Sequence, residues 1–332
     1  MPASTAIPVT LGLMTWGKEG ANMARVHDIS ECERMLDVFL SHGHNEVDTA
    51  LMYGHGSSEE YLGQIDYKSR GIVVDTKLIP GDYDGREVRF TLPSIRKWLE
   101  VQLKAIGTDC LDMWYLHAPD YSTPLEETAE AVNTLYKEGK FKRFGVSNYA
   151  AWQVQKLVDI ADKNGWIKPT AYQGIYNALH RSVEAELFPC LRANNISLYQ
   201  FNPLAGGILT GNLKRDANVE KGSRFDPNTK QGEQYRSRYW REEFFKAIDL
   251  IQPVADKYSL TLPEIALRWV AHHSCLDASK GDNILVGASS VKHLESNLAD
   301  LEKGPLPEEV VKVLDEAWQV TKSVASSYFR TE

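Results

Sequence analysis

The sequence has few features that would point to a metal, a membrane or a disulfide scaffold. Its four cysteines lie far apart and none belongs to a C-x-x-C pair, so we expect neither a disulfide framework nor a zinc site. No stretch approaches the roughly 20 apolar residues that a membrane-spanning helix needs. The first residues lack the basic and apolar regions of a secretory signal. These absences predict a cytoplasmic protein in a reducing compartment.

An excess of positive charge is also missing. Lys and Arg number 37 against 45 Asp and Glu, which gives a formal net charge of -8 at pH 7. This balance argues against a nucleic-acid partner, because such binding depends on neutralising phosphates. Apolar residues, in contrast, make up 43% of the 332 residues, which is enough for a sizeable core. We therefore expect a folded protein, and its acidity is compatible with a local basic pocket for an anionic ligand.

Short apolar, β-branched segments alternate with amphipathic segments along the chain. The expected strands are residues 10–14, 45–48, 72–77, 111–116, 144–147, 170–172, 197–201 and 283–286. Between them, residues 29–43, 92–107, 124–140 and 150–165 have apolar side chains at three- and four-residue spacing, and several of these segments end at a glycine. Eight strand–helix units predict an α/β fold, a (β/α)₈ TIM barrel forming one domain over residues 1–332.

An open, doubly wound sheet is the alternative architecture. It would be expected to carry a G-x-G-x-x-G motif after the first strand, and none is present there. The similar stretch "GHGSSE" follows the second strand and has Glu59 in place of the third glycine. We therefore favour the barrel. The polar segment 211–241 is then expected to be a long loop after the seventh strand, and function concentrates in such loops.

Titratable side chains follow three successive strands. Asp48 and Tyr53 come after the second strand, Lys77 ends the third and His117 follows the fourth. Each residue alone also suits a structural role. Asp48 could cap a loop and Tyr53 could be an aromatic side chain at the rim. Lys77 could be a solvated strand end, and His117 could be a hydrogen-bonded structural histidine. In a barrel, however, the carboxyl ends of the strands form the active-site face. The four side chains are therefore expected to lie close together.

Carbonyl reduction is a reaction that needs this set of side chains. Hydride transfer leaves negative charge on the carbonyl oxygen, which a positioned acid must protonate. Tyr53 can hold that proton at neutral pH, and we expect the ammonium group of Lys77 to lower the pKa of Tyr53. Asp48 would hold Lys77, and His117 would orient the substrate oxygen.

Several motifs resemble the aldo-keto reductase superfamily over essentially the whole chain: "VDTALMYG", "TKL", "LHAPD", "GVSNY", "YQGIYN" and "GASSVKHLESNL". The stretches "FNPLAGGILTG", "YRSRYWREEFF", "ALRWVAHHS" and "SYFR" are similar to the group of aflatoxin-aldehyde and succinic-semialdehyde reductases. The resemblance implies a (β/α)₈ barrel and NADPH-dependent reduction of aldehydes. It also implies the catalytic tetrad Asp48, Tyr53, Lys77 and His117, with Tyr53 as the proton donor.

The resemblance further implies a set of cofactor contacts at the other strand ends. These are Ser147, Asn148, Gln173, Phe201, Asn202, Leu204, Gly206, Leu209, Gly211, Arg224, Gly287, Ser289, His293 and Asn297. The hydroxyl and amide groups of Ser147, Asn148 and Gln173 suit a nicotinamide carboxamide, although the Ser-Asn pair would also suit a helix N-cap.

Two of these positions depart from the family pattern. Phe201 stands where relatives generally have a tyrosine, and its ring can still stack on nicotinamide. His293 stands where relatives often have arginine or glutamine, near a helix start suited to the 2′-phosphate, with Lys292 beside it. We therefore expect a preference for NADPH, with a weaker hold on the phosphate than an arginine would give.

The implied substrate contacts are Trp16, Met52, His117, Tyr235, Arg238 and Arg330. The arginines suit a carboxylate receptor for aldehydes such as succinic semialdehyde or 2-carboxybenzaldehyde. Alternatively, the Arg-rich stretch is a solvated helix start that pairs with Glu242 and Glu243. Aromatic aldehydes and dialdehydes also remain candidate substrates.

Other readings of the chain stay open. An aryl-alcohol dehydrogenase working toward oxidation, or a cofactor-sensing subunit resembling potassium-channel β-subunits, would share the same fold and tetrad. The adjacent His272 and His273 point in different directions on a helix, so we expect them to be structural and expect no metal. Both a monomer and a homodimer are compatible with the sequence.

Overall fold

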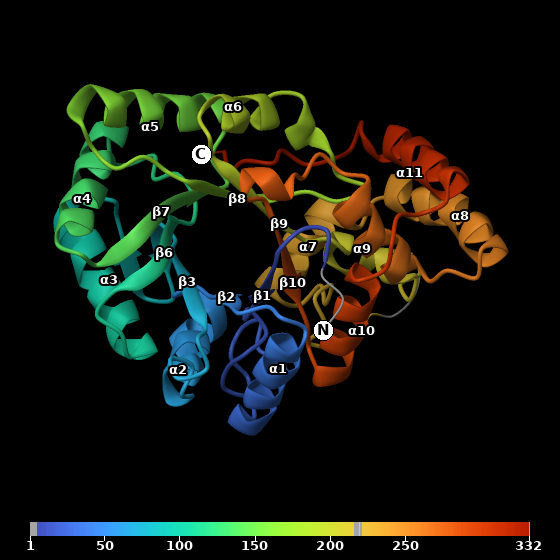
Figure 1. The fold of residues 1–332 in the computed structure, drawn as a ribbon, viewed down its shortest axis with the longest axis horizontal. Coiled ribbons are helices and arrows are strands. Elements are labelled where there is room, and N and C mark those ends of the chain that lie inside the picture. Colours follow the sequence, from blue (N-terminus) through green and yellow to red (C-terminus); the bar gives the residue numbers. More distant parts are fainter. Residues whose placement is uncertain (1–4, 216–218, 220, 332) are drawn as a thin grey trace.

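The structure, a computed structural model, describes residues 5–215, 219 and 221–331. Eight parallel strands form a closed barrel in the order β1-β10-β9-β8-β7-β6-β3-β2, with helices around it (Figure 1). The strands are β1 (Val9–Gly12), β2 (Glu46–Asp48), β3 (Val73–Leu78), β6 (Leu111–Leu116), β7 (Phe141–Ser147), β8 (Ala171–Ile175), β9 (Ser197–Phe201) and β10 (Asn283–Gly287). All eight expected strands are present, and the predicted (β/α)₈ barrel is confirmed.

Helices connect and flank these strands. They are α1 (Ile29–Ser41), α2 (Ser57–Gln64), α3 (Leu92–Ile106), α4 (Leu125–Lys137), α5 (Ala151–Asn164), α6 (Leu187–Ala193), α7 (Lys230–Tyr239), α8 (Glu242–Lys257), α9 (Leu262–His272), α10 (Val291–Leu301) and α11 (Glu308–Thr321). The four helices that the periodicity predicts appear as α1, α3, α4 and α5. Helices α3 and α5 end at Gly107 (φ 76°) and Gly165 (φ 66°), in the left-handed conformation that glycine adopts readily.

The strand register brings the expected catalytic positions to one rim. Asp48 on β2 pairs with Asp75 on β3. Lys77, two residues further along β3, pairs with Tyr115 on β6, so His117 lies just beyond the end of that strand. Because the strands are parallel and in register, their carboxyl ends present Asp48, Lys77 and His117 on the same side of the barrel.

The barrel interior is filled by side chains. Met113, Tyr115, Ala171, Tyr199 and Leu285 form a buried apolar cluster inside it, while a larger core lies between the strands and the helices. This packing closes the middle of the barrel, so a ligand can approach only from an end.

One feature that the sequence analysis does not predict is an antiparallel hairpin after β3. It consists of β4 (Gly81–Tyr83) and β5 (Arg86–Val88). Its turn carries the dipeptide Asp84-Gly85 with positive φ angles of 56° and 75°, a hairpin signal in the sequence.

The expectation of a long loop over 211–241 was wrong for residues 230–239, which form α7. The side chain of Thr229 caps this helix by accepting a hydrogen bond from the backbone N–H of Gly232. Although the segment is polar, the buried rings of Tyr235 and Tyr239 supply its packing face. Residues 216–218 and 220 of the segment lie outside the described residues.

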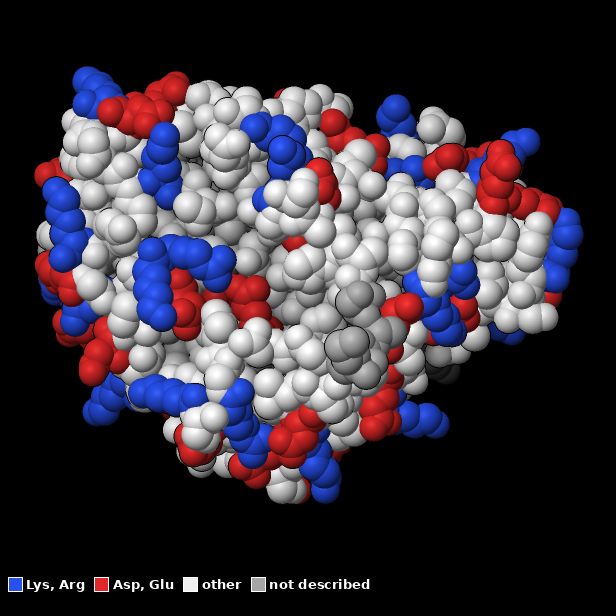
Figure 2. Space-filling view, in the orientation of Figure 1, with Lys and Arg blue, Asp and Glu red and all other residues white. Residues whose placement is uncertain are grey.

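The surface is charged with both signs. Figure 2 shows acidic and basic side chains interspersed over the face that it draws, as the near balance of the two in the sequence would suggest. Within the described ranges, no helix combines the length and apolar character needed to cross a bilayer.

Candidate active site

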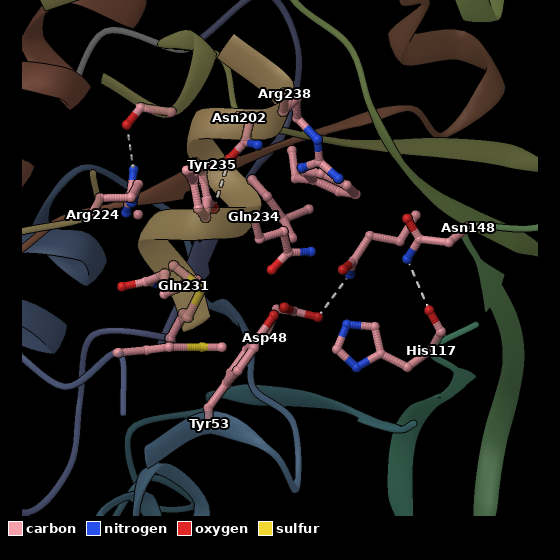
Figure 3. Close-up of a pocket in the computed structure, with 18 of the residues that line it drawn as sticks. Asp48, Tyr53, His117, Asn148, Asn202, Arg224, Gln231, Gln234, Tyr235 and Arg238 are labelled. Atoms are coloured by element: carbon pink, nitrogen blue, oxygen red, sulfur yellow. Dashed lines mark hydrogen bonds between the residues drawn. The ribbon is translucent and has the colours of Figure 1, made fainter. Parts of the chain in front are cut away.

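A cavity of about 530 Å³ lies at the carboxyl ends of the strands. Its walls come from strand ends, from α7 and from Ser327, Phe329 and Arg330 near the C-terminus. Figure 3 shows residues of α7 at the cavity, among them Gln234 and Arg238. Three of the four expected catalytic residues, Asp48, Tyr53 and His117, line it. The cavity is therefore the place to test the expected chemistry.

Lys77, the fourth expected residue, lies directly behind the cavity wall. Its side chain is fully buried, and its Nζ lies 2.5 Å from Asp48 Oδ1 and 2.8 Å from the carbonyl oxygen of Thr49. The other carboxylate oxygen of Asp48 accepts a hydrogen bond from Gln173 Nε2 at 2.8 Å. Burial raises the pKa of Asp48, while Lys77 and Gln173 act in the opposite direction. Each carboxylate oxygen thus has a buried donor.

The environment of Tyr53 corrects one expectation. Burial raises the pKa of Tyr53 well above its ordinary value, and the nearby charge of Asp48 adds to this effect. The net direction is opposite to the expected lowering by Lys77, because burial has the largest effect on this pKa. The ammonium group of Lys77 is bound to Asp48 and lies over the ring of Tyr53, 5.0 Å from the centroid. The phenol of Tyr53 therefore carries its proton at neutral pH.

His117 faces the cavity as a neutral imidazole. Burial lowers its pKa well below the ordinary value, and the positive charges of Lys77 and Arg330 lower it further. Its ring lies edge-on to that of Tyr53, with the centroids 6.1 Å apart. In the part of the chain that the structure describes, the buried Nδ1 atom has no hydrogen-bond partner. A neutral imidazole beside a protonated phenol can supply two donors to one acceptor atom.

The expected cofactor residues fall into two groups. Those that line the cavity are Asn148, Gln173, Phe201, Asn202, Leu204, Gly206, Arg224, Gly287 and Asn297. Ser147, Leu209, Gly211, Ser289 and His293 do not line the cavity. Ser147 is fully buried and accepts a hydrogen bond from Asn148 Nδ2 at 2.9 Å.

The alternative role of the Ser-Asn pair as a helix cap is not observed. Helix α5 begins after Ala150 and has no side-chain N-cap from either residue. Asn148 has a left-handed backbone (φ 59°) and donates from Nδ2 to the carbonyl oxygen of His117 at 2.8 Å. This amide therefore helps to fix the backbone of His117.

The donor set fits a nicotinamide dinucleotide. Amide side chains (Asn148 and Gln173) lie at one part of the cavity wall, and the guanidinium of Arg224 lies at another, 5.2 Å over the ring of Tyr235. At Gly287, a Cβ would meet no protein atom within 4 Å, so this part of the wall is open to a ligand. Amides suit a carboxamide, and a guanidinium suits phosphates.

The start of α10 adds a further anion-binding feature. The Oγ of Ser290 caps this helix, and Ser289 Oγ lies 3.1 Å from Nδ1 of the exposed His293. A helix N-terminus favours negative charge. Ser289 and His293 lie at this helix start, outside the cavity wall.

Of the expected substrate contacts, Met52, His117, Tyr235, Arg238 and Arg330 line the cavity. Trp16 is not among the lining residues, and its side chain is fully buried. Arg330 is held by its backbone: its N–H donates to the carbonyl oxygen of Asn148 at 2.9 Å, and its carbonyl accepts from Tyr121 Oη at 2.6 Å. A substrate contact at Trp16 therefore stays a prediction.

Sequence reasoning missed several lining residues, among them Met14, Thr15, Met23, Ile79, Gln231, Gln234, Ser327 and Phe329. Gln231 and Gln234 belong to α7, which the sequence analysis treated as a loop (Figure 3). Their spacing of three residues, in register with Tyr235 and Arg238, is a helical signal that could have found them.

His272 and His273 contact backbone groups. Nε2 of His272 lies 2.7 Å from the carbonyl oxygen of Lys303, and Nε2 of His273 accepts from the N–H of Leu306 at 2.8 Å. These contacts are the structural role expected for both histidines.

Comparisons with known proteins show the family to which the chain belongs. Residues 8–319 match the Aldo/keto reductase family. The chain is 50% identical over 296 residues to an aldo-keto reductase of Pseudocercospora fijiensis, covering 89% of this chain and 100% of that protein. It is 42% identical over 319 residues to aflatoxin B1 aldehyde reductase member 2 of Homo sapiens, covering 93% and 87%.

Among solved structures, the glycerol dehydrogenase of Gluconobacter oxydans is similar in fold, with a TM-score of 0.70 at 23% sequence identity over 98% of this chain and 94% of that one. The family match spans nearly the whole barrel and includes Asp48, Tyr53, Lys77 and His117. The chain belongs to the aldo/keto reductase family and is an oxidoreductase, with aflatoxin aldehyde reductases among its relatives.

Proposed function

We propose that this protein reduces aldehydes to alcohols with NADPH, and that Tyr53 is the proton donor. One observation carries the proposal: the protonated phenol of Tyr53 and the neutral imidazole of His117 face the same cavity, in front of the buried Lys77–Asp48 pair. A carbonyl oxygen placed between the two rings would meet two hydrogen-bond donors.

When bound, the reduced nicotinamide supplies a hydride to the carbonyl carbon. As negative charge grows on the oxygen, His117 donates a hydrogen bond that orients it, and Tyr53 transfers its proton. An alkoxide is a much stronger base than a phenolate, so this transfer is favourable even though the pKa of Tyr53 is raised. The ammonium of Lys77, 5.0 Å from the ring centroid, stabilises the phenolate that remains.

The cofactor proposal rests on donors at separate parts of the site. Asn148 and Gln173 would hold the carboxamide, and the ring of Phe201, which lines the cavity, would stack on the nicotinamide. Arg224, together with Ser289 and His293 at the start of α10, would hold the phosphates. These groups support NADPH over NADH, since NADPH carries the additional 2′-phosphate.

Substrate preference is proposed from the charge of the cavity wall. Arg238 and Arg330 line the wall, and Asp48, the acidic group among the described lining residues, is already paired with Lys77. The two guanidinium groups can therefore bind a substrate carboxylate. We propose carboxylated aldehydes such as succinic semialdehyde and 2-carboxybenzaldehyde as good substrates, with uncharged aromatic aldehydes and dialdehydes contacting Met52.

The test is NADPH consumption with succinic semialdehyde, 2-carboxybenzaldehyde and benzaldehyde. Tyr53→Phe should reduce turnover of all three to a small residual rate while the variant still binds NADPH. Arg238→Ala should lower kcat/KM for the two carboxylated aldehydes and leave benzaldehyde nearly unchanged. Arg241→Ala is the matched control, because Arg241 lies just beyond α7 and is exposed outside the cavity.

If Tyr53→Phe turns over as fast as the wild type, the proton donor is misassigned. Slow wild-type turnover with NADPH retained through purification would instead favour the cofactor-sensing alternative. We also propose a reducing compartment such as the cytoplasm, in keeping with four free cysteines.

A further inference from the structure

The segment that carries Tyr53 has an unusual backbone. Gly54, His55 and Gly56 all have positive φ angles, of 55°, 58° and 96°. His55 is not a glycine, so its side chain makes this left-handed conformation unfavourable. A strained conformation of this kind persists when surrounding contacts over-determine it. The question is which contacts hold the segment around Tyr53.

The β4–β5 hairpin supplies several of these contacts, in addition to the hydrogen bond from the N–H of Gly54 to the carbonyl oxygen of Asn22 at 3.2 Å. Tyr83 Oη donates to the carbonyl oxygen of Met52 at 3.0 Å. The guanidinium of Arg86 donates to two carbonyl oxygens, from Nη1 to Leu51 at 3.4 Å and from Nη2 to His55 at 2.9 Å. These acceptors lie on both sides of Tyr53 in the chain, so Arg86 spans the segment as a fork.

A fourth contact comes from the tip of the hairpin. Nδ1 of His55 lies 2.5 Å from Oδ2 of Asp84. The strained residue is therefore held twice, through its carbonyl oxygen by Arg86 and through its side chain by Asp84. Both partners belong to the hairpin.

The hairpin itself is anchored on α3 and the core. Trp98 Nε1 donates to the carbonyl oxygen of Glu87 at 3.0 Å, and Ser94 Oγ accepts from the N–H of Arg89 at 3.0 Å. Val88 and Phe90 are buried. These contacts attach the hairpin to α3 and to the core, so the hairpin can support the segment that carries Tyr53.

We propose that the β4–β5 hairpin positions Tyr53 for proton transfer, chiefly through Arg86. The inference rests on the proposed role of Tyr53 as proton donor. Arg86 is a positioning residue: it binds the backbone on either side of Tyr53 and transfers no proton. Small displacements of a catalytic group lower the rate steeply, whereas cofactor binding uses other strand ends.

The first test is Arg86→Ala. We expect kcat for aldehyde reduction to fall by about 10- to 100-fold, while the Kd for NADPH, measured by fluorescence quenching, stays at the wild-type value. Added guanidinium chloride should restore part of the lost kcat, and Arg86→Lys should be intermediate because an ammonium group cannot reproduce the fork. Arg89→Ala is the matched control, since Arg89 pairs with the exposed Asp82 and Glu87 on the same hairpin.

The second test places Arg86→Ala in a Tyr53→Phe background. If Arg86 acts through the tyrosine hydroxyl, the double variant should be no slower than Tyr53→Phe alone. A further loss as large as in the wild-type background would overturn the inference. A wild-type kcat in Arg86→Ala, with Tyr53→Phe nearly inactive, would also overturn the inference. This result would leave the proposed function intact. Wild-type turnover in Tyr53→Phe would instead remove the proposed function.

Tyr83→Phe keeps the inference testable if Arg86→Ala fails to fold. It removes one hydroxyl and its hydrogen bond to Met52. We expect a smaller loss of kcat than for Arg86→Ala, again with an unchanged Kd for NADPH. An unchanged kcat in Tyr83→Phe, together with a misfolded Arg86→Ala, would count against the hairpin as a positioning device.

Discussion

Lys77 and Asp48 form an ion pair that is shielded from solvent, with side-chain exposures of 0% and 2% and a distance of 2.5 Å between Nζ and Oδ1. The two residues come from neighbouring strands, β3 and β2. Because water cannot compensate either charge here, each depends on the other. The pair therefore links the proposed active site to the stability of the fold.

Lys77→Met should lower both activity and stability. It leaves the buried carboxylate of Asp48 without its cation, and removing one member of a buried ion pair typically costs about 3–5 kcal/mol of unfolding free energy. Turnover of all aldehydes should fall together. Urea unfolding and NADPH consumption measure the two effects.

The double variant Lys77→Met/Asp48→Asn is the control for this prediction. It removes both charges, so it should regain stability relative to Lys77→Met while remaining slow. Equal stability of the single and double variants would show that the uncompensated charge of Asp48 is not the cause.

Glu59 should make stability depend on pH. Its side chain is fully buried behind Lys77, where it accepts hydrogen bonds from Thr76 and Gln102, and burial raises its pKa to about 7. A raised pKa means that the folded state holds the proton more tightly than the unfolded state does. The stabilisation is therefore complete below the ordinary pKa of glutamate and is lost as the pH rises through about 7, by an amount on the order of 3 kcal/mol.

Glu59→Gln tests this sign, because the amide oxygen can still accept both hydrogen bonds but does not titrate. Urea unfolding midpoints should fall between acidic and mildly alkaline pH more in the wild type than in Glu59→Gln. The same pH dependence in both proteins would assign the effect to other groups.

His293→Arg should strengthen the preference for NADPH. His293 lies at the exposed start of α10 beside Ser289, and an arginine there would add a permanent charge for the proposed 2′-phosphate. A charge-assisted hydrogen bond suggests a KM for NADPH lower by about tenfold, with the KM for NADH unchanged. A parallel change in both KM values would place the 2′-phosphate elsewhere.

Arg330→Met should change specificity rather than chemistry. Arg330 lines the cavity, and its Nη1 donates to the carbonyl oxygen of Pro80 at 3.4 Å. Loss of a charged hydrogen bond to a substrate carboxylate predicts a decrease in kcat/KM of about 10- to 100-fold for succinic semialdehyde. Benzaldehyde should be affected little, and an equal loss for both aldehydes would argue against a carboxylate contact.

Much of the fold and of the proposed tetrad follows from local sequence patterns. Strand and helix periodicities depend on residues close together in the chain, and eight repeats of the unit predict the barrel. Once the barrel is assumed, a side chain at the end of a parallel strand must lie on the active-site rim. For this reason the sequence alone predicts that Asp48, Tyr53, Lys77 and His117 lie close together.

Other properties were decided only by the tertiary structure. The burial of Trp16 and the raised pKa of Tyr53 depend on which distant side chains exclude water and where Lys77 places its charge. The contacts of Arg86 with the Tyr53 segment join residues more than thirty positions apart. Sequence periodicity carries no information on such long-range packing, because one local pattern is compatible with many different neighbours in space.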